Sequence, residues 1–378
     1  MINTSFIKPR KQHLITHAVP DYLQDATYPA LTGIRGLAII LVLLYHLGIN
    51  HFLRQANSWL TGRTGVDIFF VLSGFLISTL LIKEKINIGR VSLKNFYIRR
   101  ALRILPLAYL FLLVMILLNQ VFHLGITGNS FFAGFLLLKN LPGNIHDHWT
   151  GHFWSLSVEE QFYLFFPLLI IWADLNKLLI LIIFALSSIL LFSLLGVHHI
   201  ADNIPLLHFI SHGMMYVFWE GPFAILTGCL ISVLAFKGFV PAQAARNNRL
   251  APVCLIVLAL VIRSPSFRFY SPYLSEFIAD MLTGLVIMLS IRSTSLITRL
   301  LNSRFLKLMG TLSYSIYIWQ QIFIWIPIRI PLTYSRGMSA NAWFILTDIV
   351  RLTGILLTAA VSYYFFERKF LRLKTHFA

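Results

Sequence analysis

The sequence predicts an all-α, polytopic integral membrane protein with about ten transmembrane helices and both termini in the cytoplasm. Of the 378 residues, 57% are hydrophobic and only 12% are charged, about half of the roughly 25% that is typical of soluble domains. The apolar residues gather in blocks of about 18 to 22, the length that a helix needs to cross a hydrocarbon core of about 30 Å. Basic residues flank these blocks in the manner of topology signals.

Ten apolar blocks account for the predicted spans. They lie near residues 33–50, 65–82, 104–123, 154–173, 177–196, 218–236, 250–267, 273–291, 311–330 and 344–366. The stretch from Phe131 to Leu138 is also apolar, but about eight residues of helix span only about 12 Å. We therefore expect that stretch to be re-entrant or interfacial.

The distribution of basic residues tests this count of spans. With ten spans and a cytoplasmic N-terminus, most of the 31 Lys and Arg residues fall on the inner side, as the positive-inside rule predicts. An eleventh span at 131–138 would place the basic clusters at 292–307 and 368–374 outside. The net charge of +17 would suggest nucleic acid in a soluble chain, but here it is interpreted as a topology signal and no nucleic-acid partner is expected.

One membrane domain is predicted, covering residues 29–370, between a basic cytoplasmic tail at 1–28 and a short cytoplasmic tail at 371–378. No cleavable signal peptide is expected, because the first apolar run starts about 30 residues in and is interrupted by charged and polar groups. The two cysteines, Cys229 and Cys254, lie in apolar stretches. They exclude a disulfide framework and a cysteine-based metal site.

The first predicted span contains Arg35 and His46, and ionisable residues inside a bilayer are functional candidates because they are costly to insert. The two are eleven positions apart, which is about three full turns, so both side chains face the same way and lie about 16 Å apart along the axis. Arg35 is expected near the cytoplasmic end and His46 near the outer end. In the alternative interpretation Arg35 reaches the inner headgroups and His46 is an interface residue.

Carboxylates are predicted at the outer ends of the second and fourth spans. Asp67 is expected at about the depth of His46, where a carboxylate would orient the imidazole and raise its basicity; alternatively it caps the helix. Ser157 followed by Glu160 matches a capping box, which would explain Glu160 structurally. Glu159 has no such explanation and is the better general acid or base. All three carboxylates are candidates to assist His46.

Basic residues cluster where the third span begins, in the segment FYIRRALRILP. Arg99 and Arg103 are four positions apart and so share a helix face, and with Arg100 they form a cationic group suited to phosphates. A cluster that only set the topology would look the same. In the last span, Asp348 and Arg351 are spaced for an intramembrane ion pair, which could equally serve packing specificity.

A metal site is not expected. His148 and His152 are four positions apart in an outer loop, a spacing that suits a metal only on a helix, and no third ligand is evident. No Gly-rich phosphate loop, zinc motif or ordered Ser-His-Asp set is present in the sequence. The remaining pattern is a basic inner mouth, an Arg and a His on one face across the bilayer, and carboxylates outside.

Several segments are familiar as a set: Arg35 and His46 in the first span, then GVDIFFVLSGFLIS, RRALRILP, WSLSVEEQFY, LSYSIYIW and the terminal YYFFERKF. Together they resemble the acyltransferase 3 family of membrane-bound O-acyltransferases. The resemblance runs from Tyr28 to Phe370, and the set is specific although each motif alone is weak. One departure is visible. In the family, the tyrosine-containing motif that corresponds to LSYSIYIW often ends in histidine, and here Gln320 stands at that position.

The resemblance implies a ten-helix domain in the bacterial inner (plasma) membrane that acetylates surface sugars, such as lipopolysaccharide, exopolysaccharide or peptidoglycan, from acetyl-CoA. It matches Arg35 and His46 to the family's essential pair, and Arg99, Arg100 and Arg103 to its cytoplasmic basic motif. Some members carry an extracytoplasmic hydrolase-like domain. This sequence has none, so we expect it to acylate its acceptor directly or to pass the group to a separate protein.

The residues and the resemblance together predict an O-acetyltransferase with acetyl-CoA as donor and no metal. The acceptor is expected to be a cell-surface glycan or a lipid-linked sugar, with membrane lipids and other envelope-glycan synthesis proteins as further partners. His46 would act as general base or would carry the acetyl group transiently. The alternatives are a flippase or transporter for a lipid-linked sugar, against which no matching pair of broken helices is seen, and a structural scaffold.

Overall fold

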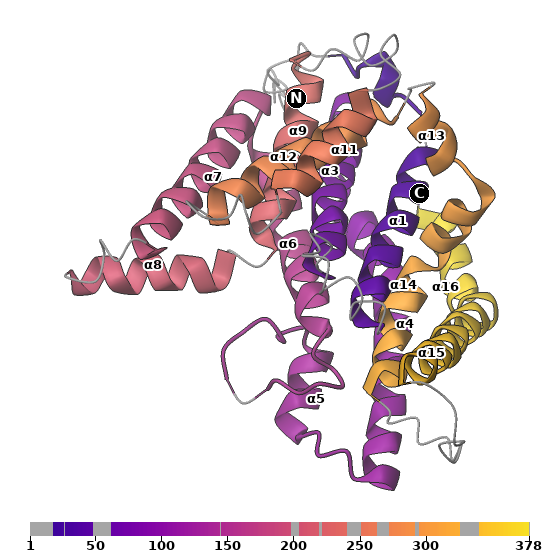
Figure 1. The fold of residues 1–378 in the computed structure, drawn as a ribbon. Coiled ribbons are helices and arrows are strands. Elements are labelled where there is room, and N and C mark those ends of the chain that lie inside the picture. The colour runs from indigo at the N-terminus through magenta and orange to yellow at the C-terminus, as the bar shows by residue number, and fades with distance from the viewer. Residues whose placement is uncertain are drawn as a thin grey trace, which may run out of the picture.

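In the computed structural model, all regular secondary structure in the described part of the chain is helical, and no strand occurs there (Figure 1). The described residues are 18–25, 27–47, 62–143, 145–197, 204–218, 221–239, 251–262, 272–291, 295–325 and 340–377. The longer helices are α1 (Pro29–His46), α3 (Gly62–Ile88), α4 (Leu93–Phe122), α6 (Phe153–Trp172), α7 (Leu175–Val197), α8 (Pro205–Phe218), α9 (Pro222–Phe236), α11 (Ala251–Ile262), α12 (Pro272–Leu289), α14 (Arg304–Trp325) and α15 (Ala340–Ser362). Shorter elements are η1 (Asp21–Leu23), α5 (Gly128–Phe135), α13 (Leu296–Leu301), the π-helical η2 (Tyr363–Glu367), α16 (Arg368–Leu373) and η3 (Lys374–Phe377).

The all-helical prediction is confirmed, and each predicted apolar block overlaps one of these helices. Five helices are long and apolar enough to cross a membrane by length and composition, within the described residues: Pro29–His46, Arg63–Ile88, Leu93–Phe122, Leu175–Leu195 and Ile345–Phe377. The apolar stretch after Gly128 forms a short helix of 8 residues, α5. Sequence analysis missed α8, and most of the predicted tail at 1–28 lies outside the described residues.

Local contacts show how α6 begins and how the carbonyl groups at its end are satisfied. The helix begins at Phe153, with His152 as its N-cap residue, so Ser157 lies in the second turn and donates to the carbonyl of Phe153 at 2.9 Å. The capping-box interpretation of Ser157 and Glu160 is therefore wrong. At the other end of α6, the ammonium group of Lys85 donates to several terminal carbonyls, which satisfies groups that a helix end leaves open.

Glycines let α1 and α14 cross at close range. A Cβ atom at Gly36 would lie 2.1 Å from the carbonyl oxygen of Leu306, and one at Gly310 would lie 1.8 Å from the carbonyl oxygen of Thr32. Both distances are shorter than any van der Waals contact, so only glycine permits this approach. Small residues at helix crossings let backbones meet closely inside membranes, where packing drives association. The crossing therefore fixes the rotation of α1 about its axis.

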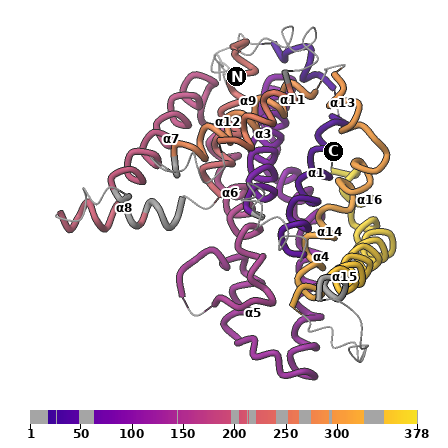
Figure 2. Tube along the Cα trace, in the orientation of Figure 1, coloured from indigo at the N-terminus to yellow at the C-terminus, as the bar shows by residue number. Residues whose placement is uncertain are grey.

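The same device joins α3 to α9. A Cβ atom at Gly74 would lie 1.9 Å from the carbonyl oxygen of Ile225, and the hydroxyl groups of Thr79 and Ser232 share a hydrogen bond of 2.9 Å across the interface. Figure 2 shows α3 running beside α9 and α1 through the centre of the molecule, with α7 and α8 on one flank and α15 on the other. The site described below is lined by residues of five helices: α1, α3, α4, α6 and α14.

Replacing Gly310 by valine should destabilise the protein, because the added side chain would collide with the backbone of α1. Overpacking of a tight core typically costs about 1–3 kcal/mol. The measurement is the thermal unfolding midpoint of the purified chain in detergent. Gly128→Val is the matched control, since nothing lies within 4 Å of a Cβ at that position. Equal midpoints for both variants would contradict the proposed role of the crossing.

Candidate functional site

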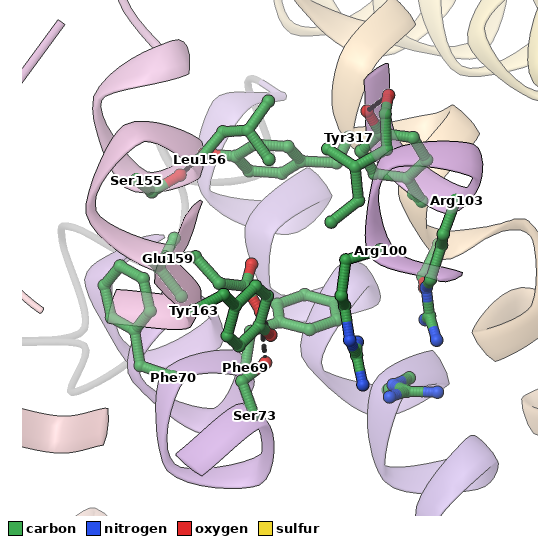
Figure 3. A pocket seen from close by; sticks show the side chains of 15 residues that line it. Phe69, Phe70, Ser73, Arg100, Arg103, Ser155, Leu156, Glu159, Tyr163 and Tyr317 are labelled. Atoms are coloured by element: carbon green, nitrogen blue, oxygen red, sulfur yellow. Dashed lines mark hydrogen bonds between the residues drawn. The ribbon is translucent and has the colours of Figure 1, made fainter. Parts of the chain in front are cut away.

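A cavity of about 100 Å³ lies at the centre of the helix core, and we call it the inner cavity. It is bounded by five helices, α1, α3, α4, α6 and α14, and Figure 3 shows its side chains from close by. The residues that line it are Arg35, Val66, Phe69, Phe70, Ser73, Arg100, Arg103, Ile104, Ser155, Leu156, Glu159, Tyr163, Ser313, Tyr314 and Tyr317.

Charge in the inner cavity is strongly asymmetric. Three guanidinium groups face it, from Arg35 on α1 and from Arg100 and Arg103 on α4, against the one carboxylate of Glu159 on α6. The guanidinium of Arg100 lies over the ring of Tyr163 at 5.0 Å, a cation–π contact. In Figure 3 the guanidinium groups of Arg100 and Arg103 lie near one end of the cavity, and Ser155 lies toward the other. Such an excess of cations suits a ligand with several negative charges.

Glu159 belongs to the inner cavity. Its carboxylate accepts hydrogen bonds from the hydroxyl groups of Ser73 and Tyr163 (Figure 3). The sequence predicted that Glu159 lies beside His46 at the outer end of the helix. Because α6 begins at Phe153, however, Glu159 lies six residues, or about 9 Å, along the helix axis. This depth places the carboxylate among the arginines.

The remaining predicted site residues are spread around the inner cavity. Arg99 lies 3.7 Å from the carboxylate of Glu84 and donates to the carbonyl of Phe377 at 2.6 Å, so Arg100 and Arg103, not Arg99 and Arg103, form the pair that faces the cavity. Glu160 and Asp67 line neither this cavity nor the one described below. Asp67 is 6% exposed within α3.

Lys374 joins the basic cluster, although sequence analysis did not select it. The terminal element η3 packs against α4, and the charge of Lys374 interacts with those of four arginines, Arg103, Arg100, Arg99 and Arg35. The signal available in the sequence was the basic C-terminal tail, which predicts a cytoplasmic position but not its neighbours. In Figure 1, α16, which precedes η3, lies on the same side of the molecule as α13 and far from α5.

A second cavity, of about 370 Å³, adjoins the first, and we call it the outer cavity. Val66 and Tyr317 line both cavities. The hydroxyl of Tyr317 shares a hydrogen bond of 2.5 Å with that of Ser155 and donates to the carbonyl of His152 at 3.0 Å. The other residues that line the outer cavity are Val42, Tyr45, His46, Arg63, Asp147, His148, Gly151, His152, Trp154, Gln320, Gln321 and Trp325.

Arg35 and His46 thus face adjoining cavities, as their spacing on one helix predicts. Arg35 lies among the cations of the inner cavity, and His46 lies in the outer cavity, with Val66 and Tyr317 at the boundary. No group of three or more His, Cys, Asp or Glu side chains that could hold a metal ion occurs in the described part of the chain. The arginines of the inner cavity suit an anionic ligand, and the imidazole in the outer cavity belongs to a side-chain type that often transfers protons.

Asp147, which sequence analysis missed, fixes the loop that borders the outer cavity. Its carboxylate lies 2.9 Å from the ammonium group of Lys139, whose side chain is fully buried. Burial raises the pKa of Asp147, but hydrogen bonds from Ser130, Thr150 and Lys139 outweigh that effect and hold the pKa at about 2. Burial lowers the pKa of Lys139, and its hydrogen bond to Asp147 opposes that shift. The pair anchors the loop that carries His148.

Two further polar contacts join the motif segments to the fold. The ion pair predicted between Asp348 and Arg351 is confirmed at 3.7 Å on α15, and it lines neither cavity. Ser315 on α14 donates at 2.5 Å to the buried carboxylate of Glu367 in η2. The tyrosine-rich motif and the terminal motif are therefore held together directly.

Comparison with known proteins gives a consistent picture. A family model described as an acyltransferase domain matches residues 28–367. Peptidoglycan O-acetyltransferase OatA of Listeria monocytogenes is 28% identical over 319 residues, which cover 77% of this chain and 48% of that protein. O-acetyltransferase OatA of Staphylococcus aureus is 26% identical over 371 residues, which cover 90% and 56%. The chain spans about half the length of these curated relatives, and no solved structure matches it significantly.

Replacing Asp147 by asparagine should destabilise the protein by about 3 kcal/mol, because it leaves the buried ammonium group of Lys139 without its countercharge. The pH dependence should change as well. The carboxyl pKa is lower in the folded chain, at about 2, than its ordinary 3.8, so its contribution to stability is complete above about pH 4 and is lost as the pH falls toward 2.

The test is the unfolding midpoint of the purified chain between pH 2 and pH 7. The part of the acid loss that the Asp147 carboxyl contributes should be absent from Asp147→Asn and present in Asp21→Asn, a control on an exposed residue. An unchanged midpoint at pH 7 in the Asp147 variant would show that the pair does not anchor the loop.

Proposed function

The chain belongs to the acyltransferase family whose model it matches, and from this premise we propose that it is a membrane O-acetyltransferase. It moves an acetyl group from acetyl-CoA on the cytoplasmic side to a hydroxyl group of a cell-surface glycan, across a domain of ten spans with both termini in the cytoplasm. The observation that carries this proposal is the pair of adjoining cavities, one cationic and one containing His46, with Val66 and Tyr317 common to both.

Acetyl-CoA binds with its phosphates at the basic cluster. Arg35, Arg100 and Arg103 face the inner cavity, and Lys374 lies within electrostatic reach of all three. Cations buried without partners are costly, and Glu159 is the one carboxylate that faces them there. A phosphate-rich ligand supplies the missing countercharge, and guanidinium groups bind phosphate oxygens through charge-assisted hydrogen bonds.

The thin pantetheine arm then passes the boundary between the cavities. It follows the face of α1 from Arg35 to His46, a distance of about 16 Å along the helix axis. Tyr317, held by Ser155 and by the carbonyl of His152, and Val66 flank this passage. The thioester reaches the outer cavity, whereas the charged nucleotide end stays with the arginines.

His46 performs the proton transfer in the outer cavity. Its imidazole takes the proton of the acceptor hydroxyl as that oxygen attacks the thioester carbonyl carbon. The carbon–sulfur bond then breaks, the acetyl group stays on the acceptor oxygen, and the CoA thiolate leaves and takes up the proton. Asp67 lies next to Val66 on α3 but lines neither cavity, so its part in orienting His46 stays a prediction from the sequence. Glu159 and Glu160 are assigned to the arginine cluster, because Arg100 interacts electrostatically with both.

His46→Ala should abolish acetyl transfer while the protein stays folded and inserted, because the variant lacks the imidazole to which the proton transfer is assigned. The assay follows labelled acetyl groups from acetyl-CoA to glycan in membranes that contain the chain. His123→Asn, on an exposed residue outside both cavities, is the control. Acetylated glycan from the His46 variant would refute its catalytic role. A flippase, the alternative function, would consume no acetyl-CoA even in the unmodified chain.

Removing charge from the basic cluster should weaken the binding of acetyl-CoA. Arg103→Gln should raise the dissociation constant about tenfold or more, because a charge-assisted hydrogen bond contributes about 1.5–3 kcal/mol. Lys374→Ala should raise it about two- to fivefold, as expected for a partly exposed ion pair. Lys369→Ala is the matched control, on an exposed lysine of the same segment. Affinity is measured by calorimetry in detergent. Equal affinity for all variants would show that acetyl-CoA does not bind at this cluster.

A further inference from the structure

The outer cavity contains two buried amide side chains whose hydrogen-bonding capacity is not used. Gln320 is fully buried, and neither its Nε2 nor its Oε1 has a hydrogen-bond partner in the described part of the chain. Gln321 is 6% exposed; its Nε2 donates to the carbonyl of His148, but its Oε1 has no partner there. A buried polar group that is left without a hydrogen bond destabilises the fold. Two such groups on one cavity wall point to a polar occupant.

The position of these amides explains their unsatisfied groups: they face a space that a ligand can occupy. Both residues lie on α14 and line the same cavity as His46. A cavity of about 370 Å³ is large enough for several water molecules, which a ligand's hydroxyl groups would replace. A primary amide offers two donors and one acceptor oxygen, so it matches groups that both donate and accept, as hydroxyl groups do.

Aromatic side chains form the rest of the wall. Tyr45, Trp154, Tyr317 and Trp325 line the outer cavity, and the ring of Trp325 stacks on that of His148 at 4.5 Å between centroids. Flat apolar faces combined with a few convergent polar groups are typical of sites for small organic ligands. A sugar ring has this dual character, because its C–H faces pack on aromatic rings while its hydroxyl groups form hydrogen bonds.

The charges around the outer cavity are compensated. The carboxylate of Asp147 is paired with Lys139 at 2.9 Å, and the guanidinium of Arg63 lies 3.8 Å from the carboxylate of Glu276. Asp147 and Arg63, the two charged residues that line the outer cavity, therefore each already have a protein group of opposite charge beside them. A charged ligand would lose hydration without gaining a countercharge, so the wall favours a neutral one.

We propose that the outer cavity is the acceptor site and that Gln320 and Gln321 hold the hydroxyl groups of a neutral sugar ring against its aromatic wall. This inference rests on the proposed function and deepens it, because it states which residues select the acceptor. The two amides orient the ring so that one of its hydroxyl groups faces His46. The ring stacks on the tryptophans, and its remaining hydroxyl groups take the free donors of Gln320 and the free oxygen of Gln321.

The test is sugar binding to the full chain in lipid nanodiscs, followed by the fluorescence of its tryptophans. Three probes of equal length separate the possibilities: triacetylchitotriose and maltotriose, which are neutral, and trigalacturonate, which is anionic. Gln320→Leu and Gln321→Leu remove the amides while keeping buried volume. The fold tolerates apolar replacement of the unpaired amide of Gln320, whereas Gln321→Leu also removes the hydrogen bond to the carbonyl of His148. Gln24→Leu makes the same change on an exposed residue away from both cavities.

At least one neutral probe should bind, and trigalacturonate should bind at least tenfold more weakly. Gln320→Leu should weaken neutral-probe binding about tenfold or more, and Gln321→Leu should weaken it by a smaller factor. Affinity for acetyl-CoA should stay within twofold in both variants, which a general loss of structure would not allow. The proposal is overturned if no neutral probe binds, if trigalacturonate binds as well as the neutral probes, or if Gln320→Leu binds like Gln24→Leu.

Acetyl transfer to the bound probe, measured separately, distinguishes this inference from the function on which it rests. Sugar binding that depends on Gln320, without transfer from acetyl-CoA, would keep the site and refute the O-acetyltransferase. Transfer with an acceptor KM that is unchanged in Gln320→Leu would keep the enzyme and refute the site. If both hold, Gln320→Leu should raise the acceptor KM about tenfold or more and leave the acetyl-CoA KM within twofold.

Discussion

The rest of the site depends on the close crossing of α1 and α14. The carbonyl of Thr32 approaches Gly310 so closely that no Cβ fits between them, and Gly36 faces Leu306 in the same way. This contact holds α1 at one rotation and one height against α14. Since Tyr317, Gln320 and Gln321 lie on α14, the contact also sets how the two ends of α1 meet the cavity walls.

The two cavities differ in how their charges are compensated, so the two ends of the site favour ligand groups of different charge. In the inner cavity the guanidinium groups outnumber carboxylates, so an anionic ligand is stabilised there. In the outer cavity Asp147 is already paired with the buried Lys139, so a neutral ligand is favoured. Under the proposed function, a donor with a charged end and a thin neutral arm places its charges at the arginines and its reacting end at His46.

Much of the fold could be predicted because hydrophobic length and helical periodicity are local properties. The ten apolar blocks overlap ten helices, and the eleven-residue spacing of Arg35 and His46 placed both on one face. The errors arose where a tertiary contact decided the outcome. The helix around Ser157 begins earlier than a capping box would allow, and that shift carries Glu159 inward to the arginines.

The sequence by itself determined that the chain is helical and apolar enough for a membrane, that basic residues flank its apolar blocks, and that an Arg and a His lie on one face of a helix. Only the tertiary structure decided which groups meet: Lys374 with the arginines, Asp147 with Lys139, and Tyr317 at the boundary between the cavities. The physical reason is that periodicity records which face of a helix is apolar, whereas the neighbour of that face is chosen by backbone approach at glycines far apart in the chain.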